Sequence, residues 1–166
     1  MAEGEFALVL EELESALKLA GQPVKRGTMA HEHIVYMMLT DTAAQIGDKM
    51  AIDRYLGLLE PLVDRDDHQP YLAVAHRARG VSQLIEGELA GAETSFNKSM
   101  DLFKEFDAPW QIGRTYCELA KLDLARSDNQ AAQIHYQQAL AEFERIQALP
   151  DLKRIRAALE TVDSYD

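Results

Sequence analysis

The chain has 166 residues, 47% of them apolar, which is enough for one sizeable core, and its 17 basic and 28 acidic side chains give a formal net charge of −11. An acidic protein repels polyanions, so nucleic acids and anionic membranes are not expected as partners. Apolar runs are short, no secretory leader is recognisable, and the single cysteine, Cys117, forms no internal disulfide. We therefore expect a single cytoplasmic domain over residues 1–166.

The N-terminal segment is predicted to form a helix over 3–19, followed by a loop over 21–28 that contains two glycines and a proline. This helix is apolar over more than half of its girth. It is therefore expected either to pack inside the fold or to form a homodimer contact.

Helical periodicity continues along the rest of the chain, and no stretch has the period-two alternation of a strand. Helix pairs are predicted at 30–46 with 49–64, 70–86 with 89–106, and 110–126 with 129–147. Pro61 lies inside one of these helices and is expected to kink it or shorten its last turn. A closing helix over 151–162 is expected to cap the chain with charged residues on its outer face. These residues are Lys153, Arg154, Arg156, Glu160 and Asp163.

Residues 80–106 reappear forty positions later without a gap. The sequence at 80, 87, 92, 96, 99 and 103 is Gly, Gly, Ala, Phe, Ser and Phe, and the sequence at 120, 127, 132, 136, 139 and 143 is Ala, Ser, Ala, Tyr, Ala and Phe. A weaker copy lies forty residues before the first. Repetition at a fixed period of this length is typical of a solenoid, in which each unit buries its apolar face against its neighbours.

The order of small and aromatic residues in these copies resembles the tetratricopeptide repeat, a pair of antiparallel helices of about 34 residues. The resemblance implies an all-α, right-handed superhelical solenoid. Its three full repeats would span 30–64, 70–106 and 110–147, with flanking helices at 3–19 and 151–162. The forty-residue spacing departs from the family pattern and implies longer helices.

The resemblance also implies a concave groove, lined by the first helix of each pair, that binds a peptide or partner helix. The groove positions are Met37, Asp41, Arg77, Val81, Leu84, Arg114, Cys117 and Lys121. The three cations among them would attract an acidic protein or peptide. The alternative interpretation is that they are ordinary solvated charges of a helix surface.

Signals for other chemistry are weak. The motif His31-Glu32-His33 has a spacing that places its two histidines on different sides of a helix, so no metal site is expected. Lys121, one turn from Cys117, would lower the pKa of the thiol if both face the groove, whereas a buried cysteine would be inert. Phosphate-binding, nucleophile-elbow and dinucleotide motifs are absent from the sequence. We expect no enzyme activity and no cofactor.

Two functions follow from these patterns. The first is a protein–protein interaction scaffold that binds its partner in the groove. The second is a regulatory or sensor segment of a larger bacterial signalling or transcription-regulatory protein. It is suggested by the forty-residue spacing and by the Phe-x-x-Phe pattern of Phe103 and Phe106 at the end of a second helix. Repeats with these two features are similar to those in bacterial transcription activators and nucleotide cyclases.

Overall fold

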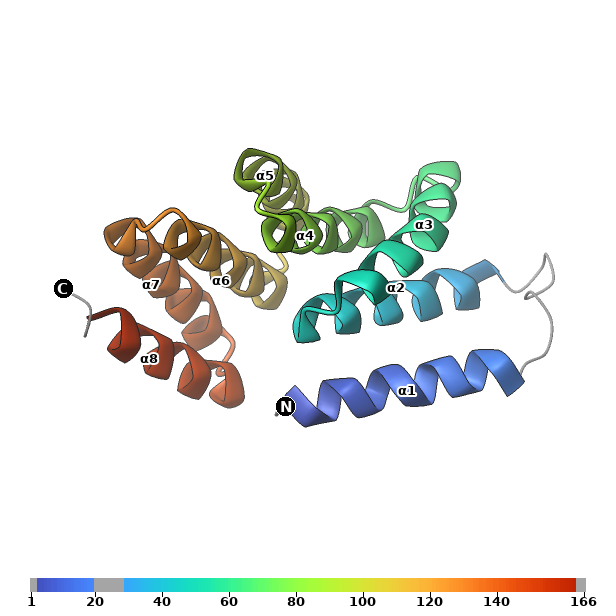
Figure 1. Ribbon diagram of the computed structural model, residues 1–166, viewed down its shortest axis with the longest axis horizontal. Helices are drawn as coiled ribbons and strands as arrows, with labels where there is room; N and C mark the ends of the chain where they lie inside the picture. Colours follow the sequence, from blue (N-terminus) through green and yellow to red (C-terminus); the bar gives the residue numbers. More distant parts are fainter. Residues whose placement is uncertain (1–2, 20–28, 164–166) are drawn as a thin grey trace.

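The computed structural model describes residues 3–19 and 29–163, and within these ranges the chain is all-α, without a strand (Figure 1). The helices are α1 (Glu3–Leu19), α2 (Met29–Ile46), α3 (Lys49–Arg65), α4 (Gln69–Glu86), α5 (Leu89–Glu105), α6 (Pro109–Ala125), α7 (Asn129–Arg145) and α8 (Leu149–Asp163). Each predicted helix end agrees with the observed one to within two residues. The predicted loop over 21–28 lies outside the described residues.

Helices α3 to α8 begin every twenty residues, at 49, 69, 89, 109, 129 and 149. The residue two positions before each start has a φ between 45° and 79°. The following residue donates its backbone N–H to the carbonyl five residues earlier, at 2.9 to 3.1 Å. This is the Schellman arrangement, which satisfies free carbonyls at a helix end. The forty-residue repeat therefore consists of two helix-and-loop units of equal length.

Pro61 does not shorten its helix, which was one of the two outcomes expected from the sequence. Helix α3 continues for four residues beyond it, to Arg65. A proline removes the hydrogen bond to the carbonyl four residues earlier, which here belongs to Gly57. Gly57 and Pro61 are both exposed, so water can bind the freed carbonyl.

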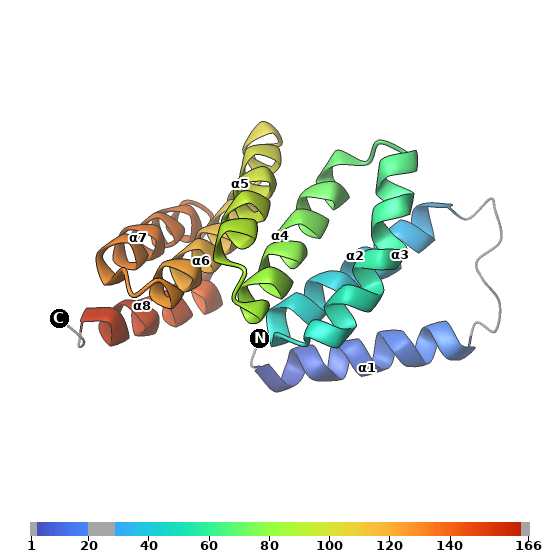
Figure 2. The same ribbon diagram turned by 45° about the horizontal axis from the view of Figure 1, so that its top comes forward.

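Each helix packs against the next one in the sequence, and α4 also packs against both α2 and α6 (Figures 1 and 2). The helices of the second pair, α4 and α5, and of the third pair, α6 and α7, meet closely at a glycine. A Cβ added at Gly80 would lie 2.4 Å from the Phe96 ring, and one added at Gly113 would lie 2.8 Å from the Phe143 ring. Both rings are fully buried. Small residues thus bring the helices of a pair together and let an aromatic ring fill the space between them.

None of the described helices combines the length and the apolarity that a membrane span requires.

Candidate functional site

A charged cluster joins three helices that follow one another in space. Asp41 of α2 accepts hydrogen bonds from Arg77 of α4 and from Arg114 of α6. Arg114 binds in a bidentate manner, with Nη1 to Oδ2 at 2.8 Å and Nη2 to Oδ1 at 2.9 Å. Arg77 donates from Nη2 to Oδ1 at 2.9 Å. One carboxylate is therefore shared by two guanidinium groups.

Further polar and aromatic groups hold both arginines in place. Arg77 donates to the Gln111 side-chain oxygen at 2.7 Å and to the Gln111 carbonyl at 3.2 Å. The guanidinium of Arg77 lies 5.1 Å from the centre of the Phe103 ring, and that of Arg114 lies 4.6 Å from the centre of the Trp110 ring. Stacking and multiple hydrogen bonds of this kind favour arginine over lysine.

The cluster remains ionised at neutral pH. Burial alone raises the pKa of Asp41, but Arg114 and Arg77 lower it by more, so that it lies well below its ordinary value. Burial and the like charge of Arg114 lower the pKa of Arg77 to about 10. Burial also disfavours the charged form of Arg114, but Asp41 outweighs it and raises the pKa of that guanidinium. All three side chains are therefore charged.

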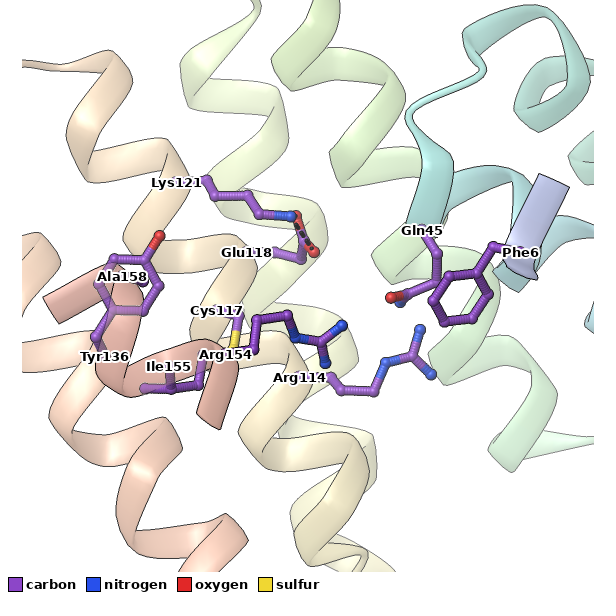
Figure 3. A pocket seen from close by; sticks show the side chains of 10 residues that line it. All are labelled: Phe6, Gln45, Arg114, Cys117, Glu118, Lys121, Tyr136, Arg154, Ile155 and Ala158. Carbon is purple, nitrogen blue, oxygen red and sulfur yellow. Dashed lines mark hydrogen bonds and ion pairs between the residues drawn. The ribbon is translucent and has the colours of Figure 1, made fainter. Parts of the chain in front are cut away.

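A cavity of about 400 Å³ lies beside this cluster (Figure 3). Helices α6, α7 and α8 form one side of it, and the other side is formed by Phe6 of α1 and Gln45 of α2. The guanidinium groups of Arg114 and Arg154 point into the space between these two sides (Figure 3). The lining residues are Phe6, Gln45, Arg114, Cys117, Glu118, Lys121, Tyr136, Arg154, Ile155 and Ala158.

The predicted groove residues differ in their positions. Three of them, Arg114, Cys117 and Lys121, line the cavity. The other five do not, although Asp41 and Arg77 reach Arg114 through the charged cluster. Arg77, Val81 and Arg114 are buried, Met37, Asp41, Leu84 and Cys117 are partly buried, and Lys121 is exposed.

The three predicted cations are each paired with a carboxylate. Arg77 and Arg114 share Asp41, and Lys121 donates to both oxygens of Glu118 at 2.9 and 3.1 Å. The alternative of ordinary solvated charges is wrong for Arg77 and Arg114, because both are at most 5% exposed. It holds in part for Lys121, which is about half exposed.

The Cys117 thiol is not activated by Lys121. Burial, together with the negative charge of Glu118, raises the pKa of Cys117 to about 12. The thiol therefore remains protonated and donates to the Gly113 carbonyl at 3.2 Å. This agrees with the expectation of a buried, inert cysteine rather than with a pKa lowered by Lys121.

Arg154 lies on a different face of the last helix from the one expected. It lines the cavity together with Ile155 and Ala158, whereas Lys153, Arg156 and Glu160 line a depression on the other face of α8. The position of Arg154 could have been predicted from the sequence, because residue 154 lies one helical turn before Ala158 and therefore on the same side of the helix. Phe6, Gln45 and Tyr136 carry no local pattern that would place them beside Arg114.

The motif His31-Glu32-His33 lies at the edge of the described residues, and nothing is described of the side chains of its first two members. The His33 ring is buried, with Nε2 3.0 Å from an Asp66 carboxylate oxygen and 3.2 Å from the Leu62 carbonyl. In the described parts of the chain, no three histidine, cysteine, aspartate or glutamate side chains gather in a geometry that would hold a metal ion.

No protein-family model matches the sequence, and comparison with curated protein sequences gives no match. Among solved structures, the chain is similar to BtubC (BKLC) from P. vanneervenii, with a TM-score of 0.60 and 13% sequence identity. The match covers 98% of this chain and 75% of BtubC. At this identity the likeness concerns the fold alone, and the similarity to BtubC supports an all-helical arrangement.

Proposed function

We propose that this chain is a cytoplasmic protein–protein interaction scaffold. In this proposal the helices form a tetratricopeptide-like, right-handed solenoid with repeats at 30–64, 70–106 and 110–147. Its concave surface, formed by α2, α4 and α6, binds a peptide or partner helix. The observation that carries the proposal is the packing of α4 against both α2 and α6, since it places the first helices of successive pairs side by side.

The partner is expected to be acidic near Lys121. This ammonium is exposed at the cavity, whereas the protein as a whole carries a net charge of −11. A local cation on a strongly acidic protein directs an acidic partner to one place and repels it elsewhere.

Charge reversal at Lys121 tests this proposal. Peptides would be selected on the native protein from a random library, and their affinity would then be measured for Lys121→Glu and for the matched control Lys104→Glu. Lys104 is an exposed lysine of α5, a second helix of a pair. We expect at least a tenfold loss for Lys121→Glu only, with unchanged helix content by circular dichroism. Equal affinity for both variants would overturn the concave surface as the docking site.

Arg77→Glu would be an unsuitable test of the same surface. Arg77 is 2% exposed and donates to the partly buried Asp41, so the substitution would place a buried carboxylate directly beside a second one. Loss of binding would then reflect loss of folding.

A regulatory or sensor segment of a larger bacterial protein is the second candidate. The cavity favours it, because about 400 Å³ is within the size range of small-molecule sites.

Self-association through α1 is a separate proposal. Leu8 of this helix is 58% exposed, and Leu8→Glu would lower the light-scattering mass if α1 forms a homodimer. A native mass equal to one chain would disprove it.

A further inference from the structure

The charged groups around the cavity do not balance. Arg77, Arg114 and Lys121 supply three positive charges, and their carboxylate partners are Asp41 and Glu118. Arg154 is paired separately with Asp151 of its own helix. The cluster therefore carries one excess positive charge, and two of its cations are almost fully buried. Because one carboxylate, that of Asp41, serves two buried guanidinium groups, an anion in the cavity would stabilise the cluster by adding negative charge beside them.

The cations that an anion would contact are already directed into the cavity. The guanidinium groups of Arg114 and Arg154 approach it from α6 and α8 (Figure 3). Arg154 is about half exposed, whereas its partner Asp151 is 13% exposed and also accepts a hydrogen bond from the Trp110 indole N–H at 3.1 Å. Asp151 would therefore keep a hydrogen-bond donor if Arg154 turned to a ligand. Arg114 already binds Asp41 through both terminal nitrogens, so the guanidinium that can match the planar geometry of a ligand carboxylate is that of Arg154.

Part of the remaining wall of the cavity is apolar, and its other lining residues are Gln45, Cys117, Glu118, Lys121 and Tyr136. Phe6 contributes a ring from α1, and Ile155 and Ala158 contribute aliphatic groups from α8. A small inorganic anion would leave this wall uncovered, whereas a carboxylate attached to an aromatic or branched aliphatic group would bury it. The volume of about 400 Å³ is sufficient for a group the size of one aromatic amino acid.

We propose that this cavity binds a small monoanion whose carboxylate is held by Arg154 beside the buried charge of Arg114 and whose apolar group packs against Phe6 and Ile155. The ligand is either a free carboxylic acid or the carboxy-terminal residue of a peptide that ends in an apolar side chain. The inference holds whether or not a longer peptide docks along α2, α4 and α6.

The first experiment uses N-acetyl-L-phenylalanine and its neutral amide, which differ only in the carboxylate. Trp110 is the single tryptophan of the chain and stacks on Arg114, so its fluorescence reports on the site. Calorimetry would provide an independent affinity. We expect saturable binding of the acid, weakened by added salt, and at least tenfold weaker binding of the amide. Equal binding of acid and amide, or no binding of the acid at millimolar concentration, would overturn the proposal.

Two arginines of α8 provide a matched pair of variants. Arg154→Gln removes the cavity cation, and Arg156→Gln removes a cation from the other face of the same helix. We expect Arg154→Gln to weaken the acid at least tenfold and Arg156→Gln to leave its affinity unchanged. Equal affinities of the two variants would count against a role of Arg154 and against the site as proposed.

A pentapeptide that ends in phenylalanine distinguishes the two sources of the ligand. Affinity equal to that of N-acetyl-L-phenylalanine would indicate a free acid, and much tighter binding would indicate a peptide terminus. If neither acid binds while the library-selected peptides still depend on Lys121, the cavity proposal fails and the scaffold proposal stands.

Discussion

The carboxylate of Asp41 joins α2 to both α4 and α6. We expect Asp41→Asn to lower the free energy of unfolding by about 3 kcal/mol or more, because it leaves two buried guanidinium groups without a counter-ion. Urea denaturation at neutral pH measures the effect. The control is Asp107→Asn, which breaks a pair of similar length, 2.8 Å to Arg145, at an exposed position. That substitution should cost less than about 1 kcal/mol. A comparable cost for both substitutions would contradict a special role for Asp41.

The contribution of Asp41 should also depend on pH. Although burial raises the pKa of this carboxyl group, its two arginine partners bring the pKa below the ordinary value of 3.8. A carboxyl group with a lowered pKa in the folded state stabilises the protein fully above the pKa of the unfolded state, and it loses this contribution as the pH falls toward the pKa of the folded state. The difference in stability between the native protein and Asp41→Asn should therefore be constant from about pH 5 to 7 and shrink below about pH 4. A difference that grows on acidification would contradict this assignment.

The sequence assigned Asp41, Arg77 and Arg114 to groove positions on the first helices of successive pairs, and the structure brings these three side chains together. The sequence did not pair them, because residues 36 and 73 positions apart follow no local rule. The presence of Asp41 among the groove positions could have indicated this pairing, since a buried cation needs a carboxylate nearby. The position of Phe6 at the cavity depends on how α1 packs against the other helices, and the periodicity of the sequence does not determine that packing.

At the scale of the helix pair, glycine permits close packing. Gly80→Ala should lower the free energy of unfolding by about 1–3 kcal/mol, since its Cβ would overlap the buried Phe96 ring. Gly57 provides the control, because it is exposed and helical and a Cβ there meets no atom within 4 Å. Gly57→Ala should stabilise the protein by about 0.5–1 kcal/mol. Thermal unfolding compares the two, and a neutral Gly80→Ala would show that the helices can separate without cost.

The loops between helices hold several residues other than glycine in the left-handed region, among them Ser127 with a φ of 60°. Ser127→Gly should stabilise the protein by about 1 kcal/mol, because an L-residue is strained in that conformation. Gly87→Ala is the reverse change at the equivalent loop, with open space around the new Cβ, and should destabilise by a similar amount. Chemical denaturation of both variants tests the pair. Effects of the same sign would refute this explanation.

The helix boundaries could be predicted because apolar stripes, Pro109 and Gly87 all mark them in the sequence. The twenty-residue spacing of the loops was less visible. At Asp67, Asp107, Ser127 and Gln147 the chain adopts a positive φ without glycine. At these positions the geometry of the helix end determines the conformation rather than the preference of the residue.

Across the whole molecule, contacts between helices are local in the sequence. The described helices pack against their neighbours along the chain and, for α2, α4 and α6, against the next but one. The buried apolar residues form two clusters, one extending from α1 to α6 and one from α6 to α8. Stability in such an arrangement is expected to be distributed among neighbouring units rather than shared equally by the whole chain.

Hydrogen exchange tests this distribution when combined with Asp41→Asn. The lost contacts belong to α2, α4 and α6, whereas α7 and α8 retain their own apolar cluster around Phe143 and Ile155. We expect amides of α2 and α4 to lose protection in Asp41→Asn and amides of α7 and α8 to keep most of theirs. Asp107→Asn should change neither group. A uniform loss of protection in all helices would mean that the molecule opens only as a whole, and the charged cluster would then stabilise every helix equally instead of the three that it joins.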